Sequence, residues 1–192
     1  MADTGASVTE LLVRARAGDQ DALQRAVAVL YHELHQMAAR QMRGEQRHHT
    51  LQPTALVNEA LLRLLPGHDI NNRLHFLALA ATTMRRVLVD YARQRRSHKR
   101  GRGAEQVTLD DNLPVGTSPR PVDVLDVDAA LSELETSNPR AARIVELRFF
   151  GGHTDKEIAE IVGLSVPTVR RDWETARVWL QARLRPPAGP PA

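Results

Sequence analysis

The stretch TDKEIAEIVGLSVPTVRRDWETAR, residues 154–177, predicts a helix-turn-helix. Thr154 and Glu157 match the capping box T-x-x-E, in which the Thr hydroxyl accepts from the Glu backbone N–H and the Glu carboxylate reaches back to the cap. Gly163 stands where a left-handed residue can end the first helix. Ser165 can cap the second helix. Both caps and the glycine therefore predict two short helices joined by a tight turn.

The second helix of this motif has one apolar face. Val169, Trp173 and Ala176 recur at i, i+4 and i+7, so we expect them to point inward. An apolar inner face combined with hydroxyl and guanidinium groups near the N-terminus suits a helix that reads bases in the major groove. An ordinary hairpin with a solvated basic face is the alternative, but the agreement of caps, glycine and spacing favours DNA reading. The predicted DNA-reading residues are Ser165, Thr168, Arg170 and Arg171.

Composition limits the class of protein. The 192 residues are enough for one large or two small domains. Aromatic residues make up only 4% of the chain and no alternating β-branched run occurs, so the predicted class is all-α. The lack of cysteine excludes disulfides, thiolate metal sites and a cysteine nucleophile. With no apolar run near the ~20 residues of a membrane helix and no signal-peptide pattern, we expect a soluble, cytoplasmic protein.

Charge is distributed unevenly, although the net charge is only +3. Residues 85–102 contain eight basic side chains and one acid, Asp90, whereas residues 104–127 contain five acids and one Arg. This pattern is typical of a polyanion-binding helix followed by a solvated linker, and a merely solvated charge run is the alternative. The predicted phosphate contacts in the block are Arg85, Arg86, Arg93, Arg95 and Arg96.

Periodicity and capping signals predict two helical blocks. The first block has four helices, with expected bounds Ser7 to Gly18, Asp19 to Gly44, Thr50 to Pro66 and His75 to Arg96, and a polar loop from His68 to Leu74. In the second block, helices near Val124 and after Pro139 precede the helix-turn-helix. We expect domains at residues 1–100 and 124–185, a flexible acidic linker at 101–123 and a disordered tail at 186–192.

The polar loop before the basic helix carries amide and guanidinium groups. Such groups can hydrogen-bond and stack on unpaired bases, so Asn71, Asn72 and Arg73, with His75 beside them, are predicted to hold a melted strand. Most polar loops have no such role, and the signal is weak by itself. His32 and His35 stand at i, i+3 and do not match the spacing of a helical zinc motif. We expect no metal, no cofactor and no catalytic residues.

Taken together, these features resemble the extracytoplasmic-function (ECF) sigma factors of bacterial RNA polymerase, in the sigma-70 family. The similarity runs from about Val8 to Leu184. Four segments carry it: LLVRARAGDQDA at 11–22 for the opening helix, ALVNEALLRLL at 55–65 for the core-binding helix, FLALAATTMRRVLVDYARQRR at 76–96 for the minus-10 and melting helix, and AARIVELRFFGGHTDKEIAEIVGLSVPTVRRDWETA at 141–176 for the minus-35 domain. The chain departs from the family pattern at Asn58, Arg86 and Pro167.

The resemblance implies an initiation factor that directs core polymerase to promoters and assists strand opening. Its implied partners are the clamp helices and flap of core RNA polymerase, duplex and unpaired promoter DNA, and a regulator such as an anti-sigma factor. The implied polymerase contacts are Leu56, Val57, Asn58, Glu59 and Arg63. Two alternatives stay open here: a stand-alone helix-turn-helix regulator, and a His-dependent hydrolase that would need a convergent polar pocket.

Overall fold

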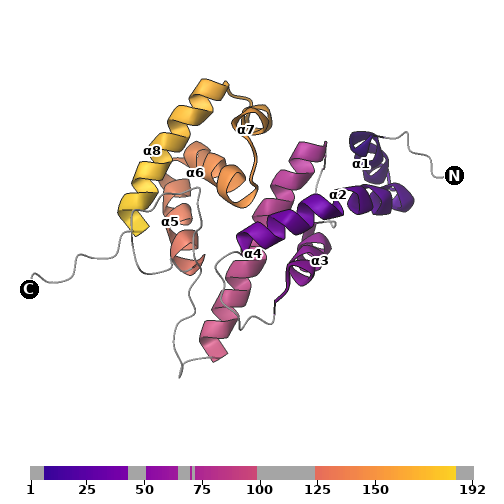
Figure 1. Ribbon diagram of the computed structural model, residues 1–192, viewed down its shortest axis with the longest axis horizontal. Coiled ribbons are helices and arrows are strands. Elements are labelled where there is room, and N and C mark those ends of the chain that lie inside the picture. Colours follow the sequence, from indigo (N-terminus) through magenta and orange to yellow (C-terminus); the bar gives the residue numbers. More distant parts are fainter. Residues whose placement is uncertain (1–6, 43–50, 65–69, 71, 99–123, 185–192) are drawn as a thin grey trace, which may run out of the picture.

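The computed structural model describes residues 7–42, 51–64, 70, 72–98 and 124–184 (Figure 1). All regular structure in these ranges is helical, so the predicted all-α class is confirmed. The elements are α1 (Val8–Arg16), α2 (Gln20–Gln41), α3 (Pro53–Leu64), α4 (Arg73–His98), α5 (Val124–Ser137), α6 (Pro139–Val145), a π-helical turn η1 (Glu146–Phe150), α7 (Asp155–Val162) and α8 (Val166–Leu184).

The predicted capping signals form as expected. Ser7 and Glu10 make a reciprocal capping box at the start of α1, and Thr154 and Glu157 make a second one at the start of α7. Gly163 adopts a left-handed backbone with φ of +67° at the end of α7. These caps satisfy backbone groups that a helix end leaves unpaired, which is why short local patterns predict the helix boundaries here.

The fourth helix begins earlier than predicted. The Asn72 side chain accepts from the backbone N–H of His75 at 2.8 Å, which starts α4 at Arg73. Arg73 and Leu74 therefore lie in the first turn of a helix, and their prediction as loop residues is wrong. Ile70, from the same predicted polar loop, is buried. The predicted stops at Gly44 and Pro66, the linker 101–123 and the tail 186–192 lie outside the described residues.

The long helix α4 lies in the middle of the molecule (Figure 1). Helices α1, α2 and α3 pack on one side of it, and α5, η1 and α7 contact it from the C-terminal part of the chain. Fully buried side chains anchor both parts, and each stabilises the fold by roughly 1.5–3 kcal/mol relative to exposure. The largest of them include Leu12, Leu30, Leu34, Leu56, Leu64, Phe76, Met84, Ile144, Leu147 and Ile158.

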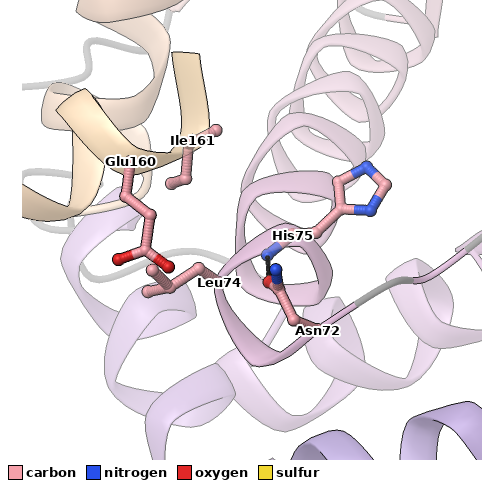
Figure 2. Close-up of a pocket in the computed structure, with 5 residues that line it drawn as sticks. All are labelled: Asn72, Leu74, His75, Glu160 and Ile161. Carbon is pink, nitrogen blue, oxygen red and sulfur yellow. Dashed lines mark hydrogen bonds between the residues drawn. The ribbon is translucent and has the colours of Figure 1, made fainter. Parts of the chain in front are cut away.

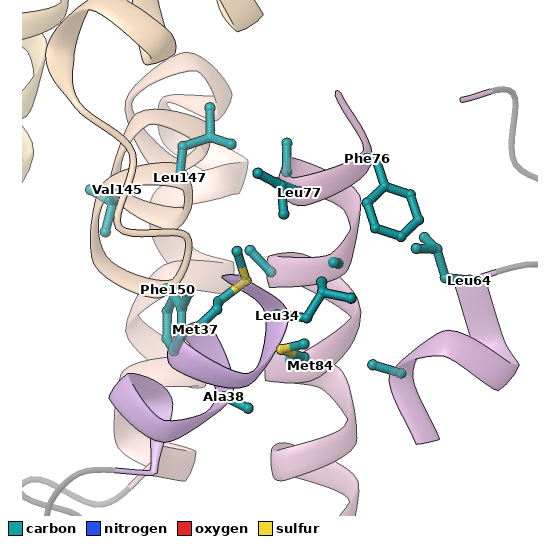
Figure 3. Close-up of a cluster of buried hydrophobic side chains, with 14 of the residues drawn as sticks. Leu34, Met37, Ala38, Leu64, Phe76, Leu77, Met84, Val145, Leu147 and Phe150 are labelled. Carbon is teal, nitrogen blue, oxygen red and sulfur yellow. The ribbon is translucent and has the colours of Figure 1, made fainter. Parts of the chain in front are cut away.

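The apolar core is continuous between the N-terminal and C-terminal helices. Figure 3 shows Phe150 beside Met37 of α2 and Leu147 on the side of η1 nearest Leu77 of α4, while Val145 lies on the far side of its helix. All five side chains are buried. The C-terminal helices are therefore docked on α2 and α4 through apolar contact.

Candidate nucleic-acid interface

Helix α8 has the two faces predicted for a recognition helix. Val169, Trp173 and Ala176 are buried, which confirms the inward-facing positions. Arg170 and Arg171 point outward, and their side chains are 68% and 73% exposed. Their guanidinium groups are thus accessible to a ligand at the N-terminal end of the helix.

One of these two arginines is fixed by its neighbours. Arg170 Nε donates to Asp155 Oδ2 at 2.9 Å, and Asp155 also accepts from Arg148. The Arg148 guanidinium lies 4.7 Å from the centre of the Trp173 ring, within the range of a cation–π contact. The chain of contacts links the outer face of α8 to its buried face, so Arg170 is held in place by groups of the same helix-turn-helix.

The start of α8 has a polar cap. The hydroxyls of Ser165 and Thr168 lie 2.8 Å apart, and the Thr168 N–H donates to Ser165 Oγ at 3.4 Å. The predicted cap at Ser165 is therefore present. Ser165 remains exposed, and Thr168 is partly buried.

Asp172 is a structural residue that the sequence reasoning missed. It is buried in α8, and Arg140 Nε of α6 lies 2.7 Å from its carboxylate, while Arg171 Nε lies 3.6 Å from it. Its position three residues after Val169 was the available signal, because i, i+3 falls on the inward stripe. An acid there needs a basic partner, and Arg140 supplies it.

Two residues of the basic block bind an acid of α5, and of these Arg85 is nearly buried whereas the Arg93 side chain is 64% exposed. Arg85 donates to Asp128 Oδ1 at 3.0 Å, its Nε lies 3.1 Å from Glu146 Oε1, and its side chain is only 12% exposed. Arg93 donates to Asp128 Oδ2 at 3.1 Å. The prediction of Arg85 as an exposed phosphate contact is wrong for this arrangement, because acids of α5 and η1 enclose its guanidinium. The Arg85 guanidinium also lies 5.7 Å from the centre of the Phe150 ring.

The other basic residues of α4 are exposed or partly buried. Arg86 and Arg96 are exposed. Arg95 is partly buried, and its guanidinium lies 5.8 Å from the centre of the Tyr91 ring. These three side chains form a basic surface that the C-terminal helices leave accessible.

Two of the predicted base-holding residues make structural hydrogen bonds within the fold. Asn72 caps α4, and Arg73 binds the carboxylate of Glu33 on α2 through both Nε and a terminal nitrogen. A cavity of about 270 Å³ lies beside this turn, between α4 and α7. Figure 2 shows Glu160 and Ile161 on one side of it and the His75 ring projecting away from them. Asn71 lies outside the described residues.

The predicted polymerase contacts on α3 divide into two groups. Leu56 and Val57 are fully buried in the core, so their prediction as surface contacts is wrong. Asn58 and Arg63 are exposed, and Arg63 donates to both Glu59 and Asp90, at 3.0 and 2.7 Å. The neighbouring Leu62 is 71% exposed, more than any other large apolar side chain in the part of the chain that the structure describes.

Comparison with known families decides the identity of the chain. A sequence model of the family described as "ECF sigma factor" matches residues 5–186. The chain belongs to the ECF sigma factor family. It is an RNA polymerase sigma factor, and the stand-alone regulator is not favoured because the match includes the N-terminal helices as well as the helix-turn-helix. ECF sigma factors are transcription initiation factors, a class without enzymatic function.

Comparison with curated protein sequences gave no match. Among solved structures, this ECF sigma factor is similar to CnrH in complex with the cytosolic domain of CnrY. The identity is 20%, the similarity covers 92% of this chain and 96% of that chain, and the TM-score is 0.41.

No group of three or more His, Asp or Glu side chains in the described part of this ECF sigma factor could hold a metal ion. His32 instead has its Nε2 2.8 Å from Nε2 of Gln36. None of the helices that the structure describes is long and apolar enough to cross a bilayer.

Proposed function

We propose that the protein reads promoters through two separate helical units, residues 1–100 and 124–185, connected by residues 101–123. The C-terminal unit binds the minus-35 element, with Ser165, Thr168, Arg170 and Arg171 at the major groove. The arrangement of α8 carries this proposal: Arg171 is 73% exposed, while Val169, two positions earlier, is fully buried. A helix anchored by its apolar face and displaying arginines near its start has the form of a major-groove reader.

The N-terminal unit binds the minus-10 region. Arg86, Arg95 and Arg96 supply charge for the DNA backbone, and their accessibility in the docked form supports this role. Arg85 and Arg93 join them once their acidic partners are removed. Asn72 and Arg73 make structural hydrogen bonds in this form. An unpaired base held at this turn would therefore contact Asn71 or His75 as well.

Core RNA polymerase binds the exposed face of α3. Asn58, Leu62 and Arg63 are accessible there, and Leu62 offers an apolar contact beside these polar side chains. The protein acts in the cytoplasm, needs no cofactor and catalyses no reaction. Its catalytic partner is the polymerase.

The assignment of α8 is tested with Arg171→Ala. If Arg171 contacts a base edge, the change lowers promoter affinity by about 1–3 kcal/mol and relaxes the preference at one base pair of the minus-35 element. Arg183→Ala is the matched control, because Arg183 is exposed near the other end of α8 and pairs with Glu133. A uniform loss on every sequence would assign Arg171 to phosphate contact instead.

A further inference from the structure

The carboxylate of Asp155 binds two arginines, one at each oxygen. Asp155 is the first residue of α7, and its Oδ2 accepts from Arg170 Nε of α8 at 2.9 Å. Its Oδ1 accepts from Arg148 of η1. The Asp155 side chain is only 16% exposed, whereas that of Arg170 is 68% exposed. A shielded acid therefore binds the inner part of an arginine that reaches into solvent.

Asp155 is itself held in one orientation. Arg148, which binds its other oxygen, has its guanidinium 4.7 Å from the centre of the buried Trp173 ring. This distance is within the range of a cation–π contact. Asp155 also follows directly after Thr154, whose hydroxyl caps α7. The cap and the core of the helix-turn-helix thus fix the acid, which can in turn fix Arg170.

The contact uses one particular edge of the Arg170 guanidinium. This group is a rigid plane with five N–H donors, of which the Nε–H donates to Asp155. No other hydrogen bond joins the Arg170 side chain to the residues that the structure describes. The edge formed by the two terminal nitrogens is left for a ligand. Two parallel donors of this kind match the O6 and N7 acceptors of guanine in the major groove.

The neighbouring Arg171 is not held in this way. Its Nε lies 3.6 Å from Asp172 Oδ1, which is too long for a hydrogen bond, and its side chain is 73% exposed. A long side chain that is fixed before binding loses less conformational entropy on binding than one that moves freely. Of these two arginines of α8, Arg170 is therefore the one that is oriented before DNA binds.

We infer that Asp155 is a positioning residue for promoter recognition: it holds the Nε edge of Arg170 so that the two terminal nitrogens read one guanine of the minus-35 element. The inference rests on the proposed role of α8 and adds a specificity determinant from outside the recognition helix. An arginine without this hold can turn to a phosphate, which carries no sequence information. Loss of Asp155 therefore weakens discrimination between base pairs more than it weakens binding.

The test measures base preference with the full-length protein bound to core polymerase. The unsubstituted holoenzyme first selects its best sequence from duplex DNA that is randomised across the promoter region. Binding is then measured to this sequence and to each of its single base-pair changes in the minus-35 element. The variants are Asp155→Ala, Arg170→Ala and the double variant. Glu160→Ala is the matched control, because Glu160 is an exposed acid of the same helix and makes no hydrogen bond to the described residues.

We expect Asp155→Ala to reduce discrimination at one guanine–cytosine pair by about fivefold or more, and Glu160→Ala to leave it unchanged. Asp155→Asn keeps the shape of the side chain without its charge, so it should cause a smaller loss, and it replaces the Ala variant if circular dichroism shows that protein to be unfolded. In the Arg170→Ala background, loss of Asp155 should cause no further change at that pair, because Asp155 acts through Arg170. A general loss of stability would not produce this pattern.

Unchanged discrimination in the Asp155 variants would overturn the inference. An equal gain in affinity on every sequence would also overturn it, because Asp155 would then compete with DNA for Arg170. A full additional loss in the Arg170→Ala background would mean that Asp155 acts through another residue. The proposed role of α8 fails separately, if neither Arg170→Ala nor Arg171→Ala changes the preference at any minus-35 position.

Discussion

Gln41 and Phe150 are 109 residues apart in the sequence, and the Gln41 side-chain amide donates to the Phe150 carbonyl at 3.1 Å. The same amide also donates to the Ala81 carbonyl of α4 at 3.3 Å. The Phe150 carbonyl is available because η1 is a π-helical turn that ends the helix there, with the Gly151 N–H bonded to Glu146 O at 3.2 Å. One side chain thus joins α2, α4 and η1, and the π turn supplies its acceptor.

The first prediction concerns the buried face of the recognition helix. Trp173→Ala should lower the free energy of unfolding of the C-terminal helices by about 3–5 kcal/mol, because it leaves a cavity and removes the ring that lies against Arg148. Urea unfolding followed by circular dichroism measures the loss. Val178→Ala on the exposed face of α8 is the control and should change stability by less than about 0.5 kcal/mol. A Trp173→Ala protein as stable as the control would place this ring outside the core.

The second prediction concerns the turn of the helix-turn-helix. Gly163 has φ of +67°, and a Cβ added there meets no atom within 4 Å. The cost of Gly163→Ala is therefore conformational, at about 1–2 kcal/mol for a left-handed residue. Gly163→Asn should cost less, because Asn tolerates this conformation better than Ala. Equal losses for the two variants, measured by urea unfolding, would mean that the turn changes shape on substitution.

These cases show which parts of the fold were predictable from the sequence. Capping boxes, the left-handed glycine and the apolar stripe of α8 are signals within a few residues, so Thr154, Gly163 and Trp173 were placed correctly. The docking of the C-terminal helices has no such local signal. It joins residues such as Arg85 and Glu146, whose pairing depends on how separate helices pack.

For the candidate site, too, the sequence did not show which side chains the packing of helices would bury or pair. The family resemblance implied Leu56 and Val57 as polymerase contacts. Both are buried instead, because consecutive residues on a helix that is covered from two sides can both face the core. Asn72 and Arg73 were expected to face unpaired bases, and instead one caps α4 and the other binds Glu33. A polar side chain near a helix start serves capping as readily as recognition.

The third prediction concerns pH. Burial lowers the pKa of His153 below its ordinary value of 6.5; the nearby carboxylate of Glu157 acts in the opposite direction, and the charges of Arg143, Arg40 and Arg73 lower it further. The unfolded chain therefore binds the His153 proton more readily than the folded one. The resulting stability is fully present above about pH 6.5 and is lost as pH falls through the lower folded-state pKa.

Urea unfolding at pH 7.5 and at pH 5 measures this effect. The native protein should lose more stability between the two values than His153→Gln, which has no proton to take up at this site. His32→Gln is the control for the loss of an exposed imidazole, because His32 lies on the surface of α2 beside Gln36. Identical pH dependence in all three proteins would exclude His153 as its source.

The last prediction separates phosphate contacts from structural arginines. Arg86, Arg95 and Arg96 lie on the part of α4 that the C-terminal helices leave accessible. Changing all three to Ala should lower the slope of log affinity against log salt by up to about 2.7, because each neutralised phosphate contributes about 0.9 on duplex DNA. The measurement is promoter binding over a range of salt concentrations.

The control for this experiment removes the same charge elsewhere. Arg14 and Arg16 lie on α1 and Arg25 lies near the start of α2. Helix α1 is on the opposite side of α4 from α5 and α8 (Figure 1), so the triple Ala variant should keep nearly the full slope. Equal flattening in the two variants would mean that net charge alone sets the salt dependence, through long-range attraction. A lower salt slope in the α4 variant alone would mean that individual phosphates bind at α4. The reason is that the slope is proportional to the number of phosphates that the protein neutralises, and not to its net charge.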